Sequence, residues 1–112
     1  MLYYMFMDTF SALADPNRRR IIELLASSGQ LTATDISDKF DISAPAVSQH
    51  LKVLREARLV DMEKKAQQRI YTINKSSLDD IENWIQKMKK VLEERYSRLD
   101  HVLETMKKGG EK

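Results

Sequence analysis

The stretch Ser43–Leu54, SAPAVSQHLKVL, has the pattern of a helix with one apolar face and one polar face. Ser43 is a typical N-cap, and Pro45 falls in the first turn, where the helix needs no N–H donor. Three apolar residues recur at i, i+4 and i+7 and form one stripe: Val47, Leu51 and Leu54. The opposite side carries small, amide or basic residues: Pro45, Ala46, Ser48, Gln49 and Lys52. Such a face suits a DNA major groove, and an ordinary amphipathic surface helix is the alternative.

The distribution of charge along the chain supports the first interpretation. Residues 43–75 hold seven basic and three acidic side chains, whereas residues 1–42 hold four basic and six acidic ones. The rest of the chain balances at eight and eight. The positive excess therefore begins with the candidate groove helix, as an electrostatic footprint for nucleic acid should, although a charge run is more often only a solvated face.

Length and composition indicate one small domain. The chain has 112 residues, 42% of them hydrophobic, and we expect a single domain over residues 1–108 with a flexible tail over 109–112. It holds no cysteine, which excludes disulfides, thiolate metal sites and thiol redox switches. The N-terminus MLYYMFMDTF lacks a basic region and carries Asp8 inside its apolar run. We therefore expect no signal peptide, no membrane partner and a cytoplasmic location.

The segment before the groove helix predicts two further helices and a tight turn. Asp15-Pro16 is typical of an N-cap and first helical position, with Ile21, Ile22, Leu24 and Leu25 expected inside and Ser28-Gly29 ending the helix. Three arginines at 18–20 oppose the macrodipole there, so we expect a phosphate or a carboxylate of a neighbouring element to attract them. Thr32 and Asp35 form a capping-box pattern for a short helix that turns at Asp41-Ile42. Two short helices joined in this way predict a helix-turn-helix.

The segment after the groove helix predicts a β-hairpin. Two β-prone runs, 59–63 and 70–73, flank a polar and basic loop. Four of its residues are suited to phosphates or a minor groove: Lys64, Lys65, Gln68 and Arg69. A hairpin directly after a helix-turn-helix is a wing.

The C-terminal third predicts one long helix, capped by Ser76 or Ser77 and running toward Lys108. Its apolar residues follow spacings of three and four, a heptad-like seam. About 30 helical residues span ~45 Å, which is longer than so small a core can cover. We therefore expect a homodimer whose interface combines the first and last helices: Leu2, Phe6, Phe10, Leu92, Tyr96, Leu99 and Leu103.

Three stretches in this order resemble the ArsR-type winged helix-turn-helix transcriptional repressors: FSALADPNRRRIIELL, LTATDISDKFDISAPAVSQHLKVLREARLV and RIYTIN. The resemblance covers residues 10 to about 85. It implies a mainly α fold with a small β-hairpin wing, dimeric through the first and last helices. It also implies a repressor that binds a palindromic operator, with the helix matching 44–56 in the major groove and the hairpin on flanking backbone.

The sequence departs from the family pattern at three places. The segment LTATDIS has no metal-sensing cysteine motif, and Asp100, His101 and Glu104 do not reproduce the ligand pattern of the last helix, so we expect no metal and no cofactor. Arg58 stands where the family has a glycine after the groove helix, and a non-glycine residue in the left-handed region costs ~1 kcal/mol. The wing also lacks its usual turn glycine.

Gln49 is the best candidate for base contacts, since its amide can pair with adenine, and a solvated surface glutamine is the alternative. His50 is interpreted as a phosphate or groove contact, or otherwise as a histidine bonded to backbone. Nothing in the sequence requires an enzyme.

The sequence thus predicts a dimeric, sequence-specific DNA-binding repressor. The alternatives are a dimerisation or protein-interaction module without specific DNA binding, and a winged-helix regulator of the MarR type. The sequence identifies neither the operator nor the regulated genes nor an effector.

Overall fold

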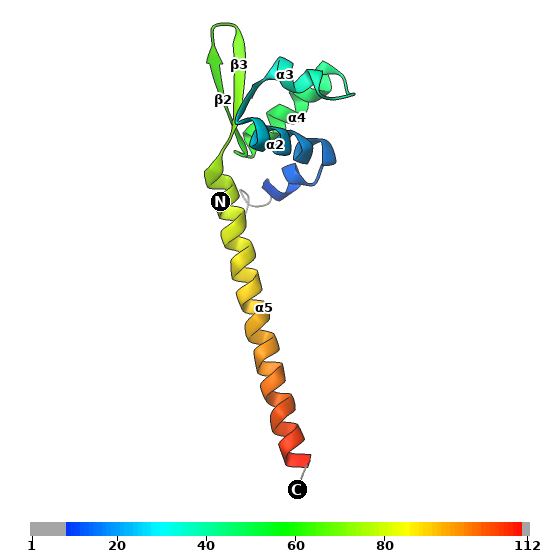
Figure 1. Cartoon of the computed structure of the whole chain (residues 1–112), viewed down its shortest axis with the longest axis vertical. Coiled ribbons are helices and arrows are strands. Elements are labelled where there is room, and N and C mark those ends of the chain that lie inside the picture. The colour runs from blue at the N-terminus through cyan, green and yellow to red at the C-terminus, as the bar shows by residue number, and fades with distance from the viewer. Residues whose placement is uncertain (1–8, 111–112) are drawn as a thin grey trace. The chain divides into compact units, whose positions relative to one another are not determined.

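The computed structural model describes residues 9–110, with side chains over residues 9–107 (Figure 1). Leu2 and Phe6 of the expected dimer interface lie outside the described residues. The chain divides into two compact units, one ending at Leu78 and the other beginning at Asp79. The single domain expected over residues 1–108 stays a prediction.

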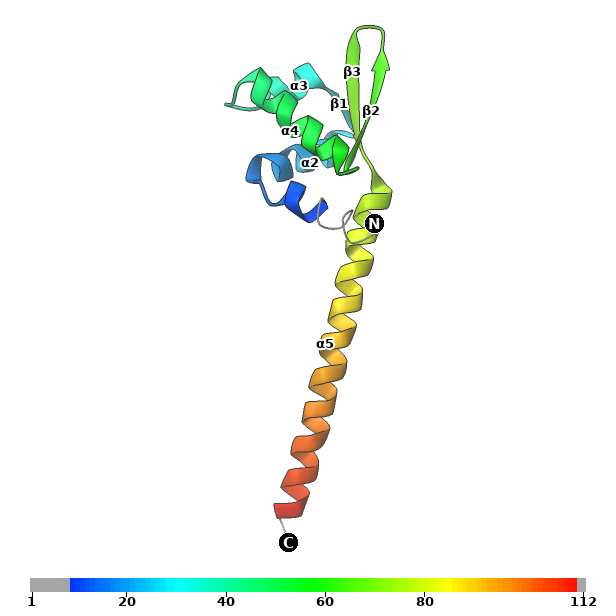
Figure 2. The same cartoon turned by 180° about the vertical axis from the view of Figure 1, so that it is seen from behind.

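The described elements are mainly helical with one small sheet (Figures 1 and 2). Residues 9–13 are helical. They are followed by α2 (Pro16–Ser28), β1 (Gln30–Thr32), α3 (Ala33–Asp38), α4 (Ala44–Glu56), β2 (Val60–Lys65), β3 (Gln68–Ile73) and α5 (Lys75–Gly110). This order confirms the winged helix-turn-helix: α3 and α4 are its two helices and the β2–β3 hairpin is its wing.

Local side chains start and stop the helices where the sequence predicts. The Asp15 carboxylate accepts the backbone N–H groups of Asn17 and Arg18 at the start of α2, at 2.8 and 3.3 Å. Gly29 ends α2 with a φ of 84°, which glycine adopts without steric cost. The capping box of Thr32 and Asp35 is formed in both directions, with N···O distances of 3.1 and 3.2 Å. These three predictions from local sequence are therefore confirmed.

The core lies between α2, α3, α4 and the sheet. Its largest fully buried side chains are Ile21, Leu25, Ile36, Val47, Leu51, Leu54, Leu59 and Val60. The expectation that Ile22 and Leu24 also lie inside is wrong, because both are only half-buried. A helix on the surface of a domain directs only a stripe of residues toward the core, and Ile21 with Leu25 fill that stripe on α2.

The sheet has three antiparallel strands in the order β1-β3-β2, with β1 beside β3 in Figure 2. Strand β1, whose Leu31 pairs with Tyr71, was not predicted from the sequence. The wing loop expected over residues 64–69 is wrong as well. Lys64, Lys65, Gln68 and Arg69 lie within the strands, since the turn between them is only two residues long. Ala66 in this turn has a φ of 55°, as primed two-residue turns require.

Arg58 adopts the strained conformation that its place in the family pattern predicts. Its φ is 60°. The strain is held by surrounding bonds, because its N–H donates to the Arg55 carbonyl at 3.0 Å and its own carbonyl accepts from the Ser77 hydroxyl. The chain therefore turns from α4 into β2 without a glycine.

Helix α5 begins one residue after Asn74, whose side-chain oxygen accepts the Ser77 N–H at 3.2 Å. Asn74 is the cap, so the prediction of Ser76 or Ser77 is wrong. The helix also continues to Gly110 instead of ending at Lys108. No helix among residues 9–110 is long and apolar enough to cross a membrane.

Candidate nucleic-acid interface

The polar face of α4 is open to solvent, as the groove interpretation requires. Most of its predicted contact residues are exposed: Ser43, Pro45, Ser48, Gln49 and Lys52. Ala46 and His50 are half-buried at one flank of this face. Because Val47, Leu51 and Leu54 are almost completely buried, the helix is fixed against rotation about its own axis.

A concavity of about 410 Å³ joins α4 to the wing. Its lining residues come from α4 and β3: Pro45, Ser48, Gln49, Lys52, Arg55, Arg69 and Tyr71. Three of them are cations and none is acidic. This surface, which we call the α4–wing concavity, can hold a phosphate beside the polar face of the helix, because its positive charges have no acidic neighbour in the lining.

The wing places like charges side by side. Lys64 lies directly opposite Arg69, and Lys65 lies opposite Gln68. Like charges at opposed positions of an antiparallel pair repel each other. Among the described residues, neither Lys64 nor Arg69 has an ion-pair partner. Side chains at alternate positions share a face, so Lys64, Arg69 and Tyr71 lie on the same face of the hairpin.

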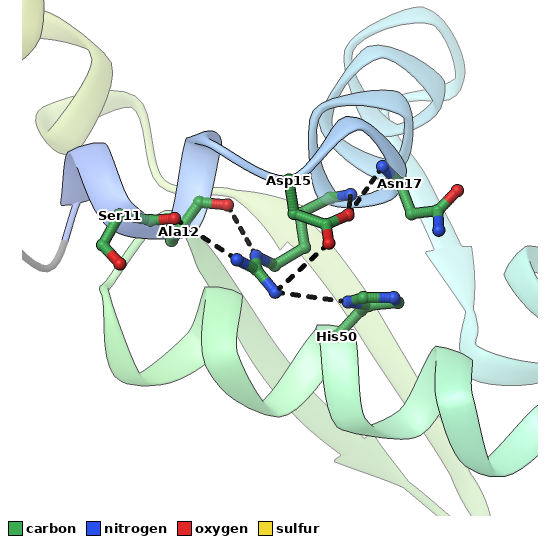
Figure 3. Close-up of polar contacts among 6 residues, drawn as sticks. Ser11, Ala12, Asp15, Asn17 and His50 are labelled. Carbon is green, nitrogen blue, oxygen red and sulfur yellow. Dashed lines mark hydrogen bonds and ion pairs between the residues drawn. The ribbon is translucent and has the colours of Figure 1, made fainter.

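At the other flank of α4, His50 lies against Arg18 of α2 (Figure 3). The Arg18 Nη1 and His50 Nδ1 atoms are 3.4 Å apart. The guanidinium is also held by the carbonyls of Ser11 and Ala12 and by the Asp15 carboxylate. The contact that the ring makes through Nδ1 is thus with a side chain of α2.

The three arginines at positions 18–20 have different surroundings. Arg18 contacts the Asp15 carboxylate and two backbone carbonyls. This carboxylate is the cap of the same helix and does not belong to a neighbouring element, contrary to the expectation. Arg20 lies over the Phe40 ring, 5.2 Å from its centroid, in a cation–π contact. Arg19 is exposed.

Burial would raise the pKa of the Asp15 carboxyl, but its hydrogen bonds from the Arg18 and Asn17 backbone, together with the nearby charge of Arg18, outweigh that effect. The pKa of Asp15 is therefore lowered from its ordinary value of 3.8. Asp15 stays ionised as the cap of α2 and as the partner of Arg18.

Three residues of this region were not predicted from the sequence. Arg55 and Tyr71 line the α4–wing concavity, and Arg18 holds His50. Arg55 follows Gln49 and Lys52 at helical spacing, so its position on the helix could have indicated it. No local signal links Arg18 to His50, which lies 32 residues away.

The apolar residues expected in the dimer interface differ in exposure. Phe10 is half-buried. The four on α5 are about half exposed: Leu92 47%, Tyr96 57%, Leu99 53% and Leu103 54%. Among the described residues, no three histidine, aspartate or glutamate side chains come together as a metal site.

Known proteins share both the sequence pattern and the fold. Residues 15–62 match the family described as "Bacterial regulatory protein, arsR family". The chain is 40% identical over 78 residues to the transcriptional repressor SdpR of Bacillus subtilis, which covers 70% of this chain and 86% of SdpR. The crystal structure of an ArsR family transcriptional regulator matches with a TM-score of 0.74 and 27% identity, over 80% of this chain and 92% of that chain.

A homodimeric winged helix-turn-helix DNA-binding domain from Mycobacterium bovis matches with a TM-score of 0.65, over 80% of this chain and 82% of that chain. At 21% identity this likeness concerns the fold alone. The sequence relatives, the matched residues and the shared fold agree, and the chain belongs to the ArsR family of bacterial regulatory proteins.

Proposed function

We propose that the protein is a transcriptional repressor that binds a palindromic operator in double-stranded DNA as a homodimer. The observation that carries the proposal is the continuous surface formed by the polar face of α4 and the cations of the α4–wing concavity. An α-helix fits the major groove, and cations beside it bind the phosphates that flank the groove. The repressor SdpR and the family membership support the same function.

The residues of this surface divide into three roles. Gln49 is the base contact, because an amide can donate and accept at an adenine edge. Ser43, Pro45, Ala46 and Ser48 are small and let the helix approach the base pairs closely. Lys52 and Arg69, both in the α4–wing concavity, bind backbone phosphates together with the wing residues Lys64, Lys65 and Gln68.

The homodimer forms through the exposed apolar residues of α5 together with the N-terminal residues Leu2, Phe6 and Phe10. Leaving a large apolar side chain in water forfeits ~1.5–3 kcal/mol relative to burial. A second copy related by a two-fold axis covers such a face with its own. Two recognition helices then contact two half-sites about one helical turn apart.

Selection of bound duplexes from random DNA tests the proposal, because it yields the operator and its symmetry together. A palindromic consensus, bound with an affinity that falls steeply with salt, is the expected result. A dimerisation or protein-interaction module would select no consensus and show no salt-dependent binding. Family membership favours the proposal over a regulator of the MarR type. A cytoplasmic location and a function that involves no catalysis complete the proposal.

A further inference from the structure

The Arg18 guanidinium contacts two backbone carbonyls and the Asp15 carboxylate, and the labelled partners are drawn in Figure 3. Its Nε donates to the Ala12 carbonyl at 2.6 Å, and its Nη2 donates to the Ser11 carbonyl at 3.3 Å. These carbonyls belong to the helical segment 9–13, where a cation near the C-terminal end is favourable. Its Nη1 lies 3.9 Å from the Asp15 carboxylate. These contacts hold the guanidinium in place independently of its contact with His50 on α4.

The contact between Arg18 and His50 determines which ring nitrogen of the imidazole accepts a hydrogen bond from the guanidinium. A guanidinium has only donors, so the Nδ1 atom of His50, 3.4 Å from Nη1, must be the acceptor. The ring hydrogen is then on Nε2. Protonation of Nδ1 would place a second N–H and a second positive charge against the guanidinium. The ring nitrogen left free to donate is therefore Nε2.

The Nε2 atom of His50 is open to solvent. No buried side-chain nitrogen or oxygen among the described residues lacks a hydrogen-bond partner, and Nε2 has no partner there. His50 follows Ala46 by four residues and shares its flank of α4. Lys52 and Arg55 lie on the other flank, in the α4–wing concavity. A helix seated in a major groove has a phosphate backbone on each side.

We propose that Arg18 is a positioning residue for DNA binding, which holds the His50 ring so that its Nε2–H donates to a phosphate oxygen of the backbone on the side of α4 away from the wing. The inference rests on the proposed function, since it needs a DNA duplex against α4. Arg18 itself does not touch the DNA in this arrangement. Because Arg18 is anchored on the carbonyls of Ser11 and Ala12, the orientation of His50 depends on the segment before α2.

Nitrogen-15 spectroscopy of the histidine rings in the full chain without DNA tests the tautomer directly. At neutral pH the His50 ring should show a protonated Nε2 and a bare Nδ1, with its signal identified by its loss in His50→Gln. Arg18→Met should return the ring to a mixture of tautomers and imidazolium. Arg19→Met removes the same charge at the next position and should leave the His50 signal unchanged. A wild-type ring with Nδ1–H, or an imidazolium, overturns the inference.

Affinity for a selected duplex tests the role in binding. His50→Ala should weaken binding roughly tenfold, with the same factor for unrelated duplexes, because one hydrogen bond to phosphate is lost per half-site. His50→Gln, which keeps an N–H near the Nε2 position, should recover most of the affinity. Arg18→Met should resemble His50→Ala, and the double variant should be no weaker than either alone.

The control pair is Arg19→Met with His50→Ala, whose effects should add. Thermal unfolding of each variant shows whether it remains folded, and the wild-type tautomer tests the inference without any variant. A wild-type protein that binds no duplex overturns the proposed function while leaving the tautomer measurement informative. Duplex binding with additive losses from Arg18→Met and His50→Ala overturns the inference alone.

Discussion

Large apolar side chains form a buried core in the first unit of the chain and are mainly exposed in the second. In the unit that ends at Leu78, Leu51 and Leu54 are 1% and 0% exposed. On α5 beyond Asp79, Leu99 is 53% and Met106 is 67% exposed. The winged helix-turn-helix thus completes its core from its own helices and sheet. The long helix has the same kind of apolar seam, but its residues are exposed. The proposed homodimer assigns this seam to association, whereas the seam of the first unit serves folding.

The largest effect is expected on the dimer dissociation constant. Leu99→Glu should raise the dimer dissociation constant by roughly 10²- to 10⁴-fold, because each substitution occurs twice in a symmetric dimer and removes ~1.5–3 kcal/mol of burial each time. Sedimentation equilibrium measures the constant, and operator affinity should fall with it. Lys90→Glu, on the opposite side of the helix, is the control. A wild-type chain that is a stable, folded monomer at micromolar concentration would refute the comparison itself.

The matching change in the buried apolar stripe of α4 is Leu54→Ala. It should destabilise the folded state by ~2–5 kcal/mol, since it leaves a cavity in the core around a side chain with no exposed surface. Denaturant unfolding measures this, and the loss should not depend on protein concentration. Leu103→Ala should instead shift the midpoint mainly through the monomer–dimer equilibrium. Equal concentration dependence for both variants would remove the distinction between the two seams.

A smaller effect distinguishes roles within the winged unit. Gln49→Ala should lose ~1–3 kcal/mol of discrimination at one base position per half-site. Arg69→Ala should weaken all sequences alike and reduce the slope of log affinity against log salt by about one. Binding titrations with the operator, single-base variants and unrelated duplexes measure both. Identical, sequence-independent losses from the two variants would show that the role assignment is wrong.

The smallest effect concerns the Asp15 cap. Its pKa is lowered in the folded protein, so its charged form stabilises the fold above the ordinary value of 3.8, and this contribution disappears as the pH falls through the lower folded-state pKa. Asp15→Asn keeps a capping side chain without the charge and should lose ~0.3–1 kcal/mol at neutral pH. Thermal unfolding between neutral and acidic pH measures the difference, which should vanish in acid. A difference of the same size at both ends of the range would mean that charge is not the cause.

Local signals account for most of the elements that the sequence predicted. The caps at Asp15, Thr32 and Ser43 act on backbone groups within three residues, and Gly29 supplies its own positive φ. The apolar stripe of α4 has helical spacing and is buried as expected. Such interactions are fixed by residues close in sequence, so their patterns can be recognised there.

The tertiary structure alone decided what joins distant segments. Strand β1 forms because Leu31 pairs with Tyr71, and a run of three residues is too short for its sequence pattern to predict a strand. The α4–wing concavity brings Arg55 to Arg69 and Tyr71, and the imidazole of His50 meets Arg18 across 32 residues. The sequence by itself determined the helices, the wing and the polar face of α4, because those follow from periodicity and capping. Which cations share a surface, and which side chain the His50 ring contacts, follow from packing between elements, whose geometry no local pattern contains.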